Sequence, residues 1–411
     1  MDDPKPEWPL FWIPPRQRRM ESWSYSCADE SCADESRSET PCEYRFRKYT
    51  GARMRIVDLF CGAGGMHLAA EREGCEIVLA SEINAICRRV YQRRFNLEPC
   101  GDVCQISSLP PHDILCAGFP CQPFSVAGSK RGFDDPGRGN MFLEIMRLIK
   151  ISKPPCIILE NVKGFAQHAS GETLQTCTLM LASEGYSAQW TILDSRDFGL
   201  AQARQRWFCV CFNDPCAASF FRFPEPTTPD RSATVGDVLD DDPGPGLALT
   251  ADENFLLDER GRREGTVKHT TLEKWRGGRR FEGVYSSLQP DGRLRFHTQV
   301  RASGMSEMQY CCARSKAYTL TKSHPTKLHD QRRRLNVREL CRLQGFPDDF
   351  TFGSVTAAQQ CLGNAVSVPV AQSVISSAKR ALLSASSQFQ ESFFGDTESG
   401  VTGTWADDDG P

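Results

Sequence analysis

The sequence predicts an α/β fold in which helices cover both faces of a parallel sheet, with a second, smaller domain inserted late in the chain. Short apolar runs alternate with helical stretches between residues 51 and 212. A glycine-rich turn joins the first run to a helix, and from Pro215 the composition shifts toward proline, glycine and aspartate. Such alternation is typical of parallel sheets, because each helix returns the chain to the edge where the next strand begins.

A strand, a helix and a second strand open the predicted sheet. Residues 55–60 form a buried apolar run, the helix after the glycine turn ends near Gly74, and residues 76–82 form the second strand. A helix is expected over 84–95. The later strands are expected at 113–118, 156–160, 186–194 and 206–212, and further helices at 140–150 and within 337–383.

Five parts are predicted along the chain. The two ends lack a sustained apolar period, and the first contains a tandem SCADE repeat, so both are expected to be disordered. The parts are a disordered leader at 1–50, the first domain at 51–212, an inserted region at 213–331, a return to the first domain at 332–383, and an acidic disordered tail at 384–411.

The charge is unevenly distributed along the 411 residues, whose formal net charge is -3. Residues 230–259 hold one basic and nine acidic side chains, whereas residues 260–301 hold eleven basic and four acidic ones. A polyanion is expected to bind the second stretch, because local distribution of charge matters more than the total. The acidic stretch either faces away from such a partner or covers its groove.

The cysteines indicate a reducing compartment. There are nineteen of them, an odd number, scattered through apparent strands and helices without a C-x-x-C pair. We therefore expect no structural metal site. The sequence also lacks an apolar run of about 18 residues and an N-terminal secretion pattern, so neither membrane insertion nor secretion is expected.

The glycine-rich turn, DLFCGAGG from Asp58 to Gly65, is a candidate nucleotide-binding turn. Glycines let the backbone approach a ligand closely, and an acid at the end of the next strand, here Glu82, can hold ribose hydroxyls. Asp102 lies near the end of a possible third strand and can accept a hydrogen bond from an adenine amine. A tight turn without a ligand is the alternative for both segments.

Cys121 is the candidate nucleophile. It lies between two prolines in GFPCQPFS, directly after an apolar strand, where a stiff loop can expose the thiol. A loop cysteine of this kind favours reactivity over a buried, inert thiol.

Charged side chains border two further apolar strands. Glu160 ends the CIILE run, where a partly desolvated carboxyl has a raised pKa and can donate a proton. Arg204 and Arg206 in QARQR stand two residues apart at the start of another strand, and either can bind a pyrimidine carbonyl or a phosphate. A solvated basic strand start is the alternative.

Six blocks in this order resemble the cytosine-C5 methyltransferase family: DLFCGAGG, GFPCQPFS, ENV, QARQR, RRLNVRELCRLQGFP and GNAVSVPVA. They extend from Asp58 to Ala371. The resemblance implies a Rossmann-like, S-adenosylmethionine-dependent methyltransferase sheet with a smaller target-recognition domain at 213–331. It also implies a set of cofactor-binding residues, namely Phe60, Gly62, Gly64, Glu82, Asp102, Val103, Asn364 and Val366. Asn84 and Ala365 depart from the family pattern without removing a group that the mechanism needs.

The chemistry of cytosine agrees with this resemblance. Position 5 of the ring is a weak nucleophile, so a thiolate must first add at C6, and Cys121 is suited to that step. Glu160 is expected to contact N3 and the exocyclic amine, Arg206 to bind O2, and Arg204 to position the cysteine loop or the base. The target base must leave the duplex to be reached.

The resemblance implies double-stranded DNA as the partner, bound by a monomer. The loop 125–140 is expected to close over the target, while the basic part of the insert supplies phosphate and base contacts. The default for any single arginine there is a solvated surface. The expected DNA-binding residues are Ser125, Arg276, Arg279, Arg280, Arg293 and Arg295.

Two other functions compete with DNA methylation. A tRNA-directed member of the same family shares the catalytic blocks, but its Cys-Phe-Thr signature is absent from this sequence. A catalytically silent adaptor would lack the Pro-Cys or ENV residues, and both are present. The predicted disorder at both ends favours a nuclear protein, or one of the cytoplasm or nucleoid if the source is prokaryotic.

Overall fold

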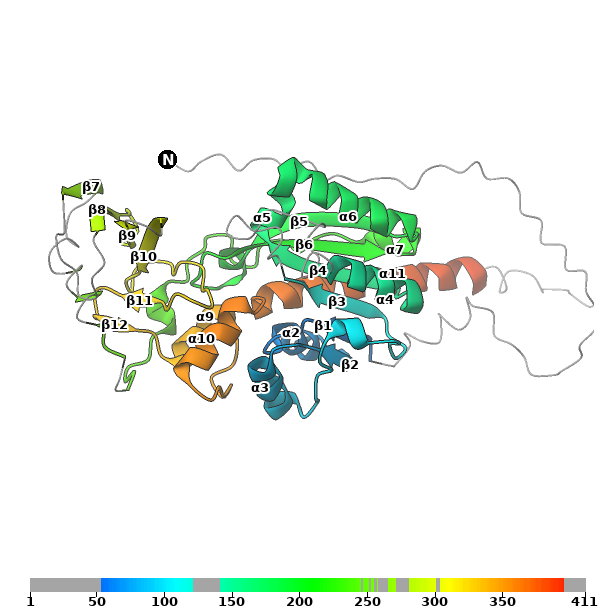
Figure 1. Ribbon diagram of the computed structural model, residues 1–411. Coiled ribbons are helices and arrows are strands. Elements are labelled where there is room, and N and C mark those ends of the chain that lie inside the picture. The colour runs from blue at the N-terminus through cyan, green and yellow to red at the C-terminus, as the bar shows by residue number, and fades with distance from the viewer. Residues whose placement is uncertain are drawn as a thin grey trace, which may run out of the picture.

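The computed structural model describes residues 53–120, 141–244, 247–250, 253–254, 257, 265–270, 281–300 and 304–394. Its centre is a six-stranded sheet in the order β2-β1-β3-β4-β6-β5 (Figure 1). The strands are β1 (Arg55–Leu59), β2 (Glu76–Ser81), β3 (Ile114–Gly118), β4 (Cys156–Val162), β5 (Ser187–Asp194) and β6 (Gln205–Phe212).

The predicted α/β class is confirmed, but the sheet is mixed. β1 pairs in parallel with β2 and β3, and β3 pairs in parallel with β4. β6, however, is antiparallel to both β4 and β5. The connection from β5 to β6 holds only the short 3-10 helix η4 (Ser195–Phe198) and a few further residues, and a parallel crossover needs a dozen or more.

Helices cover both faces because alternate residues of each central strand enter different cores. Ile56 of β1 belongs to one apolar cluster and Val57 to the other. The first cluster contains side chains of α2 (Gly65–Arg72) and α3 (Ala85–Phe95), and the second those of α4 (Met141–Ser152), α5 (Lys163–Gln167) and α6 (Glu172–Ser183). Strands buried on both faces are apolar throughout, which is why these runs were recognisable.

The C-terminal part returns to the first domain as three helices. These are α9 (Val337–Gln344), α10 (Val355–Asn364) and α11 (Val368–Phe394). The Nζ atom of Lys379 on α11 donates to the Glu73 carbonyl at 2.6 Å, at the end of α2. The helix continues past residue 383, the predicted last residue before the acidic tail, because Leu382 and Ala385 are buried in the core on either side of that point.

The inserted region contains an antiparallel sheet in the order β10-β9-β8-β7, which Figure 1 shows at one end of the molecule. Its strands are β7 (Gly265–Thr270), β8 (Phe281–Leu288), β9 (Leu294–Val300) and β10 (Gly304–Tyr310). A two-stranded sheet, β11 (Lys327–Leu328) with β12 (Arg333–Arg334), follows. The insert begins later than residue 213, since α7 (Pro215–Phe220) packs its buried Ala217 into the core of the first domain.

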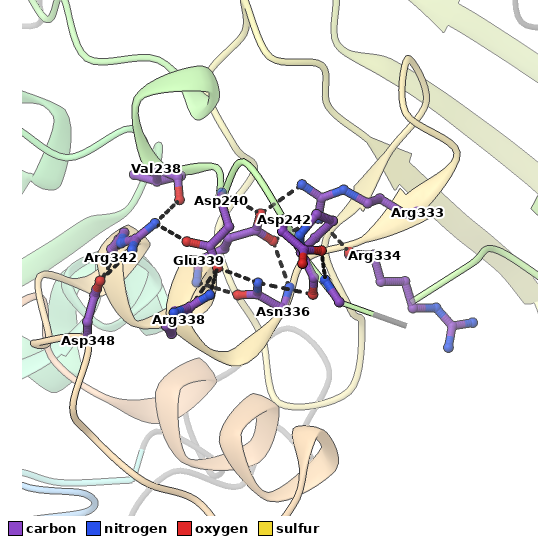
Figure 2. A network of polar contacts seen from close by, with 12 residues as sticks. Val238, Asp240, Asp242, Arg333, Arg334, Asn336, Arg338, Glu339, Arg342 and Asp348 are labelled. Carbon is purple, nitrogen blue, oxygen red and sulfur yellow. Dashed lines mark hydrogen bonds and ion pairs between the residues drawn. The ribbon is translucent and has the colours of Figure 1, made fainter. Parts of the chain in front are cut away.

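Part of the acidic stretch 230–259 fastens the insert to α9 (Figure 2). The Asp240 carboxylate accepts from Asn336 Nδ2 at 2.6 Å, Arg338 Nε at 3.0 Å and Arg342 Nη1 at 2.7 Å. Glu339, which is fully buried, pairs with Arg333 at 2.7 Å and accepts from the Asp240 backbone N–H at 3.0 Å. These contacts give Asp240 a structural role, which neither sequence interpretation of the stretch included.

Candidate active site

The site lies between β1 and β3, where the order of the strands in the sheet reverses. β1 and β3 are adjacent, and the sheet extends from β1 to β2 on one side and from β3 to β4 on the other. In open α/β sheets, ligands bind in the crevice beyond the carboxyl ends of the strands at such a point. The glycine turn follows β1 and the GFPC segment follows β3, so the two candidate segments leave the sheet side by side.

Backbone geometry explains the glycines of the turn. Gly62 and Gly64 have φ of 57° and 92°, and Phe60 has φ of 59°. The Glu82 carboxylate is fixed to this turn, because Oε2 accepts from Gly62 N at 3.0 Å and Oε1 accepts from Asn84 N at 2.7 Å. The structure thus brings Gly62 and Glu82, two of the predicted cofactor-binding residues, into direct contact.

We expect Gly64→Ala to destabilise the chain by about 1–3 kcal/mol through overpacking. An added Cβ would lie 2.2 Å from Cε2 of Phe95, whose ring stacks on His67 at 3.8 Å and has little room to move. Gly74→Ala is the matched control, since Gly74 also has a positive φ but its Cβ would meet nothing within 4 Å. Urea unfolding of both variants measures the difference, and equal losses would refute the steric explanation.

Asp102 and Val103 lie beside the end of β2. The predicted third strand before Asp102 is absent from this described part of the chain. Asp102 Oδ1 accepts from Cys104 N at 3.0 Å and caps the 3-10 helix η1 (Val103–Gln105). Cys100 forms only an isolated bridge with Ser81. The next strand, β3, begins at Ile114. Val103 is 3% exposed and packs in the core.

The C-terminal block reaches the same turn. A Cβ placed on Gly65 would lie 2.9 Å from the Val366 carbonyl oxygen and 3.0 Å from its Cγ1, so the two backbones are in close contact. Asn364 is the last residue of α10 and is exposed. The fold therefore joins the two ends of the predicted cofactor set, which are about 300 residues apart in sequence.

Glu160 and Arg206 form an ion pair at the carboxyl end of β4. Arg206 Nε lies 3.2 Å from Glu160 Oε1, and both side chains are mostly buried. Burial raises the pKa of Glu160, and the guanidinium groups of Arg206 and Arg204 oppose that rise without cancelling it. Gly118 is the register partner of Glu160, and its Cβ would lie 3.4 Å from Glu160 Oε2. The carboxyl thus lies at the start of the GFPC segment.

Asn161, which the sequence interpretation left without a role, supports that segment. It is 2% exposed, and its Nδ2 donates to the Phe119 carbonyl at 3.2 Å, two residues before Cys121. Its Oδ1 accepts from Val162 N at 2.8 Å. The signal in the sequence was an amide side chain within the ENV block, directly after a buried strand. A buried amide needs hydrogen-bond partners, which indicates a structural role.

Arg204 lies in the interior and has a different environment from Arg206. It is 2% exposed, and it donates to the carbonyls of Leu320 at 2.9 Å, Gly363 at 3.2 Å and Ala365 at 2.7 Å. These carbonyls belong to the insert and to the C-terminal block. A guanidinium so enclosed holds backbone segments in place and is not presented to a base.

Two buried glutamines, also missed from the sequence, connect the same segments. Gln202 Nε2 donates to the Leu343 carbonyl at 2.9 Å. Gln344, on α9, donates to the Leu362 carbonyl at 2.6 Å and accepts from the Ser367 hydroxyl at 3.0 Å. Three of the six sequence blocks therefore meet in one buried hydrogen-bond network.

Of the predicted DNA-binding residues, Arg293 and Arg295 are described. Their guanidinium carbons lie 4.9 and 5.1 Å from the ring centroid of Tyr318, and Arg293 also pairs with Asp291 at 2.7 Å. The predicted nucleophile Cys121 and the predicted DNA contacts Ser125, Arg276, Arg279 and Arg280 lie outside the described residues.

Among the described residues, no three His, Cys, Asp or Glu side chains gather in a way that could hold a metal ion. No helix in the described ranges has the length and apolar character needed to span a bilayer.

The chain is similar to known methyltransferases in sequence. A family model described as C-5 cytosine-specific DNA methylase matches residues 54–380. The type II methyltransferase M.NgoBI of Neisseria gonorrhoeae is 35% identical over 319 residues, covering 77% of this chain and 90% of the relative. M.HhaI of Haemophilus parahaemolyticus is 31% identical over 333 residues, covering 80% and 95%. These relatives are bacterial and give no support to the expected nuclear location.

Solved structures agree on the fold. The S. pombe Dnmt2 methyltransferase superposes with a TM-score of 0.55 at 19% identity, covering 80% of this chain and 99% of its own. The Entamoeba histolytica methyltransferase EhMeth gives a TM-score of 0.59 at 17% identity with the same coverage. The resemblance of the six blocks is confirmed by the family match, and this chain belongs to the C-5 cytosine-specific DNA methylase family, as a DNA (cytosine-5-)-methyltransferase.

Proposed function

We propose that this enzyme methylates C5 of a cytosine flipped out of duplex DNA, with S-adenosylmethionine as cofactor and a temporary covalent bond to Cys121. The observation that carries the proposal is the Glu160–Arg206 pair near the carboxyl end of β4, opposite Gly118 of β3. A carboxyl with a raised pKa, held by a guanidinium, can protonate or hydrogen-bond a pyrimidine ring on which negative charge develops.

The residues around the glycine turn fit the cofactor. A Cβ on Gly62 would meet no atom within 4 Å, so the turn borders open space. Glu82, fixed against that turn, keeps lone pairs for ribose hydroxyls. Asp58 Oδ2 is buried without a hydrogen-bond partner among the described residues, as expected of an acceptor that faces a ligand. Phe60, Gly64, Asp102, Val103, Asn364 and Val366 would complete the binding site.

The cofactor, when bound, supplies an electrophilic methyl group. The Cys121 thiolate adds to C6 of the cytosine, while Glu160 donates a hydrogen bond to N3 and Arg206 binds O2. Electron density then builds at C5, which takes up the methyl group. A base or water removes the C5 proton, and the thiolate leaves. Asn161 acts as a positioning residue through the Phe119 carbonyl, and Arg204 through the carbonyls of the C-terminal block.

Duplex DNA is the proposed substrate, bound by a monomer. The basic side chains of the insert would contact phosphates and base edges, namely Arg276, Arg279, Arg280, Arg293 and Arg295, together with Ser125 of the segment after Cys121. Arg293 and Arg295 are already stacked on Tyr318, so less side-chain entropy remains to be lost on binding.

A trapping experiment tests the covalent step. Duplex DNA containing 5-fluorocytosine and labelled S-adenosylmethionine should give a stable adduct with the wild-type enzyme, because fluorine at C5 cannot leave as a proton does. The adduct peptide should contain Cys121, and Cys121→Ser should give none. Label transferred to tRNA alone would contradict DNA as substrate. DNA binding without transfer would favour the adaptor function instead.

A further inference from the structure

Two buried thiols from distant parts of the chain touch beside the proposed cofactor site. Cys87 on α3 and Cys361 on α10 are 274 positions apart in sequence, and their Sγ atoms lie 3.5 Å from each other. Both are free thiols, 6% and 1% exposed. A contact of this kind needs only a small approach of the two sulfurs to become a bond.

The other close pair of described cysteines provides a contrast. The Sγ atoms of Cys209 and Cys211 are 3.6 Å apart, but both residues belong to β6 and are separated by one residue. Alternate residues of a strand have Cβ atoms about 6–7 Å apart, whereas a disulfide requires about 3.5–4.5 Å. The backbone of β6 therefore keeps Cys209 and Cys211 too far apart to form a disulfide. Cys87 and Cys361 lie on separate helices and are not restrained in this way.

Both helices border the cofactor-binding turn. α3 begins three residues after Glu82, and Asn84 caps its first turn by accepting from Cys87 N at 3.2 Å. α10 ends at Asn364, and Val366 then packs against Gly65 of the glycine turn. A covalent link between the two helices would join the two sides of the proposed pocket.

We propose that a peroxide oxidises Cys87 and Cys361 to a reversible disulfide and that this bond weakens cofactor binding. The effect on cofactor binding rests on the proposed function, since it takes the glycine turn to be the cofactor site. Formation of the disulfide depends only on the contact between the two thiols.

The oxidation balances with hydrogen peroxide as the oxidant. The Cys361 thiolate attacks one peroxide oxygen, giving a sulfenic acid and releasing hydroxide, which takes up the proton lost from the thiol. The Cys87 thiol then displaces the sulfenic oxygen as water, so that two thiols and one peroxide give one disulfide and two waters. The hydrogen bond from Cys87 lowers the pKa of Cys361, which favours that order.

We expect a small oxidant to reach the pair from the start of α3. Ile83 is 69% exposed, and Asn84 and Ala85 are also exposed, so the first turn of this helix borders solvent. Larger disulfide reagents would meet the buried sulfurs only after the helix end opens. We therefore expect oxidation by peroxide to be much faster than by glutathione disulfide.

The bond would disturb the pocket because α10 has no free space around its end. An S–S bond is about 2 Å long, so the sulfurs must approach by about 1.5 Å. A Cβ on Gly363 would lie 2.4 Å from the Lys322 backbone nitrogen, and a Cβ on Gly65 would lie 2.9 Å from the Val366 carbonyl oxygen. Movement of α10 toward α3 must then displace the block that carries Val366.

Peptide mapping and calorimetry test the two parts separately. After peroxide treatment and alkylation, trypsin should yield residues 73–88 linked to 343–379, with fragment ions that place the bond at Cys87 and not at Cys75. Cys87→Ala and Cys361→Ala should each abolish this species, and Cys209→Ala should retain it. Cofactor affinity should fall at least fivefold in the oxidised wild type, recover with a reductant, and stay unchanged by peroxide in the two alanine variants.

Binding is measured because oxidation of Cys121 would stop turnover by itself. Absence of the linked peptide from folded, peroxide-treated protein would overturn the disulfide. A linked protein with unchanged cofactor affinity would overturn its effect on the pocket. If the reduced wild type bound no S-adenosylmethionine, the proposed function would be contradicted, while the linked peptide would still establish the disulfide.

Discussion

Glu160→Gln is expected to lower the rate of methyl transfer by about 10²- to 10⁴-fold, the range usual for loss of a general acid. The amide keeps the size of the side chain and can still contact the ring, but it has no acidic proton to share with N3. Arg206, now 3.2 Å from the carboxylate, would retain its place beside β4. Single-turnover transfer from labelled cofactor to duplex DNA measures the loss, and cofactor affinity should remain within about twofold.

The pH dependence separates this proton from a merely structural contact. Burial raises the pKa of Glu160, so the folded enzyme holds the proton to a higher pH than an ordinary glutamate would. The wild-type rate should therefore fall as pH rises through that raised pKa, and the glutamine variant should lack this limb. A variant within tenfold of the wild-type rate, or one that keeps the limb, would remove Glu160 from the proton transfer.

The stability of the glutamine variant should change in the opposite direction to its activity. Because the folded state binds this proton more tightly than the unfolded chain, Glu160 contributes stability at low pH that is lost as pH rises toward and through the raised pKa. The glutamine side chain does not titrate. We therefore expect the variant to gain stability relative to the wild type over that interval, so its lost activity would not reflect unfolding.

Local sequence patterns predicted the parts of the fold that local physics determines. The strands of the sheet carry apolar side chains toward two cores, which leaves the continuous runs seen at 55–60 and 156–160. The apolar pattern of β6 does not indicate its direction, since an antiparallel strand buried on both faces has the same composition as a parallel one. Only the short connection from Asp194 to Gln205 determines it.

Roles that depend on distant backbone were not visible in the sequence. Arg204 and Arg206 are two residues apart and were given similar chemistry, yet the strand begins at Gln205 and only Arg206 reaches Glu160. The partners of Arg204 lie 116 to 161 positions away. The role of Asp240 was hidden for the same reason, because its three donors lie 96 to 102 positions away, at the N-cap and along the length of α9.

Arg204→Met is expected to destabilise the folded chain by about 3–5 kcal/mol, as for removal of one partner from a buried charged contact. The guanidinium donates to three backbone carbonyls from Leu320, Gly363 and Ala365, and methionine would leave all three without that donor. Leaving a buried acceptor unpaired costs about 1–3 kcal/mol each, less the desolvation of the charge that is removed. For a chain of this size, the melting temperature should fall by on the order of 5 °C.

Arg206→Met provides the matched control, because Arg204→Met is expected mainly to lower stability and Arg206→Met mainly to lower activity. Arg206 pairs with Glu160 across the neighbouring strands β4 and β6, and it donates to the Gln205 carbonyl at 2.8 Å. Its loss should reduce methyl transfer but lower the melting temperature less than Arg204→Met does, because the buried Glu160 carboxyl has a raised pKa and can take up a proton when its cation is removed. Arg204→Lys should recover part of the lost stability, since an ammonium can still donate to the nearest carbonyls but cannot span all three. If Arg204→Met had the melting temperature of the wild type and only its activity fell, Arg204 would act in the reaction itself and not in holding the C-terminal block.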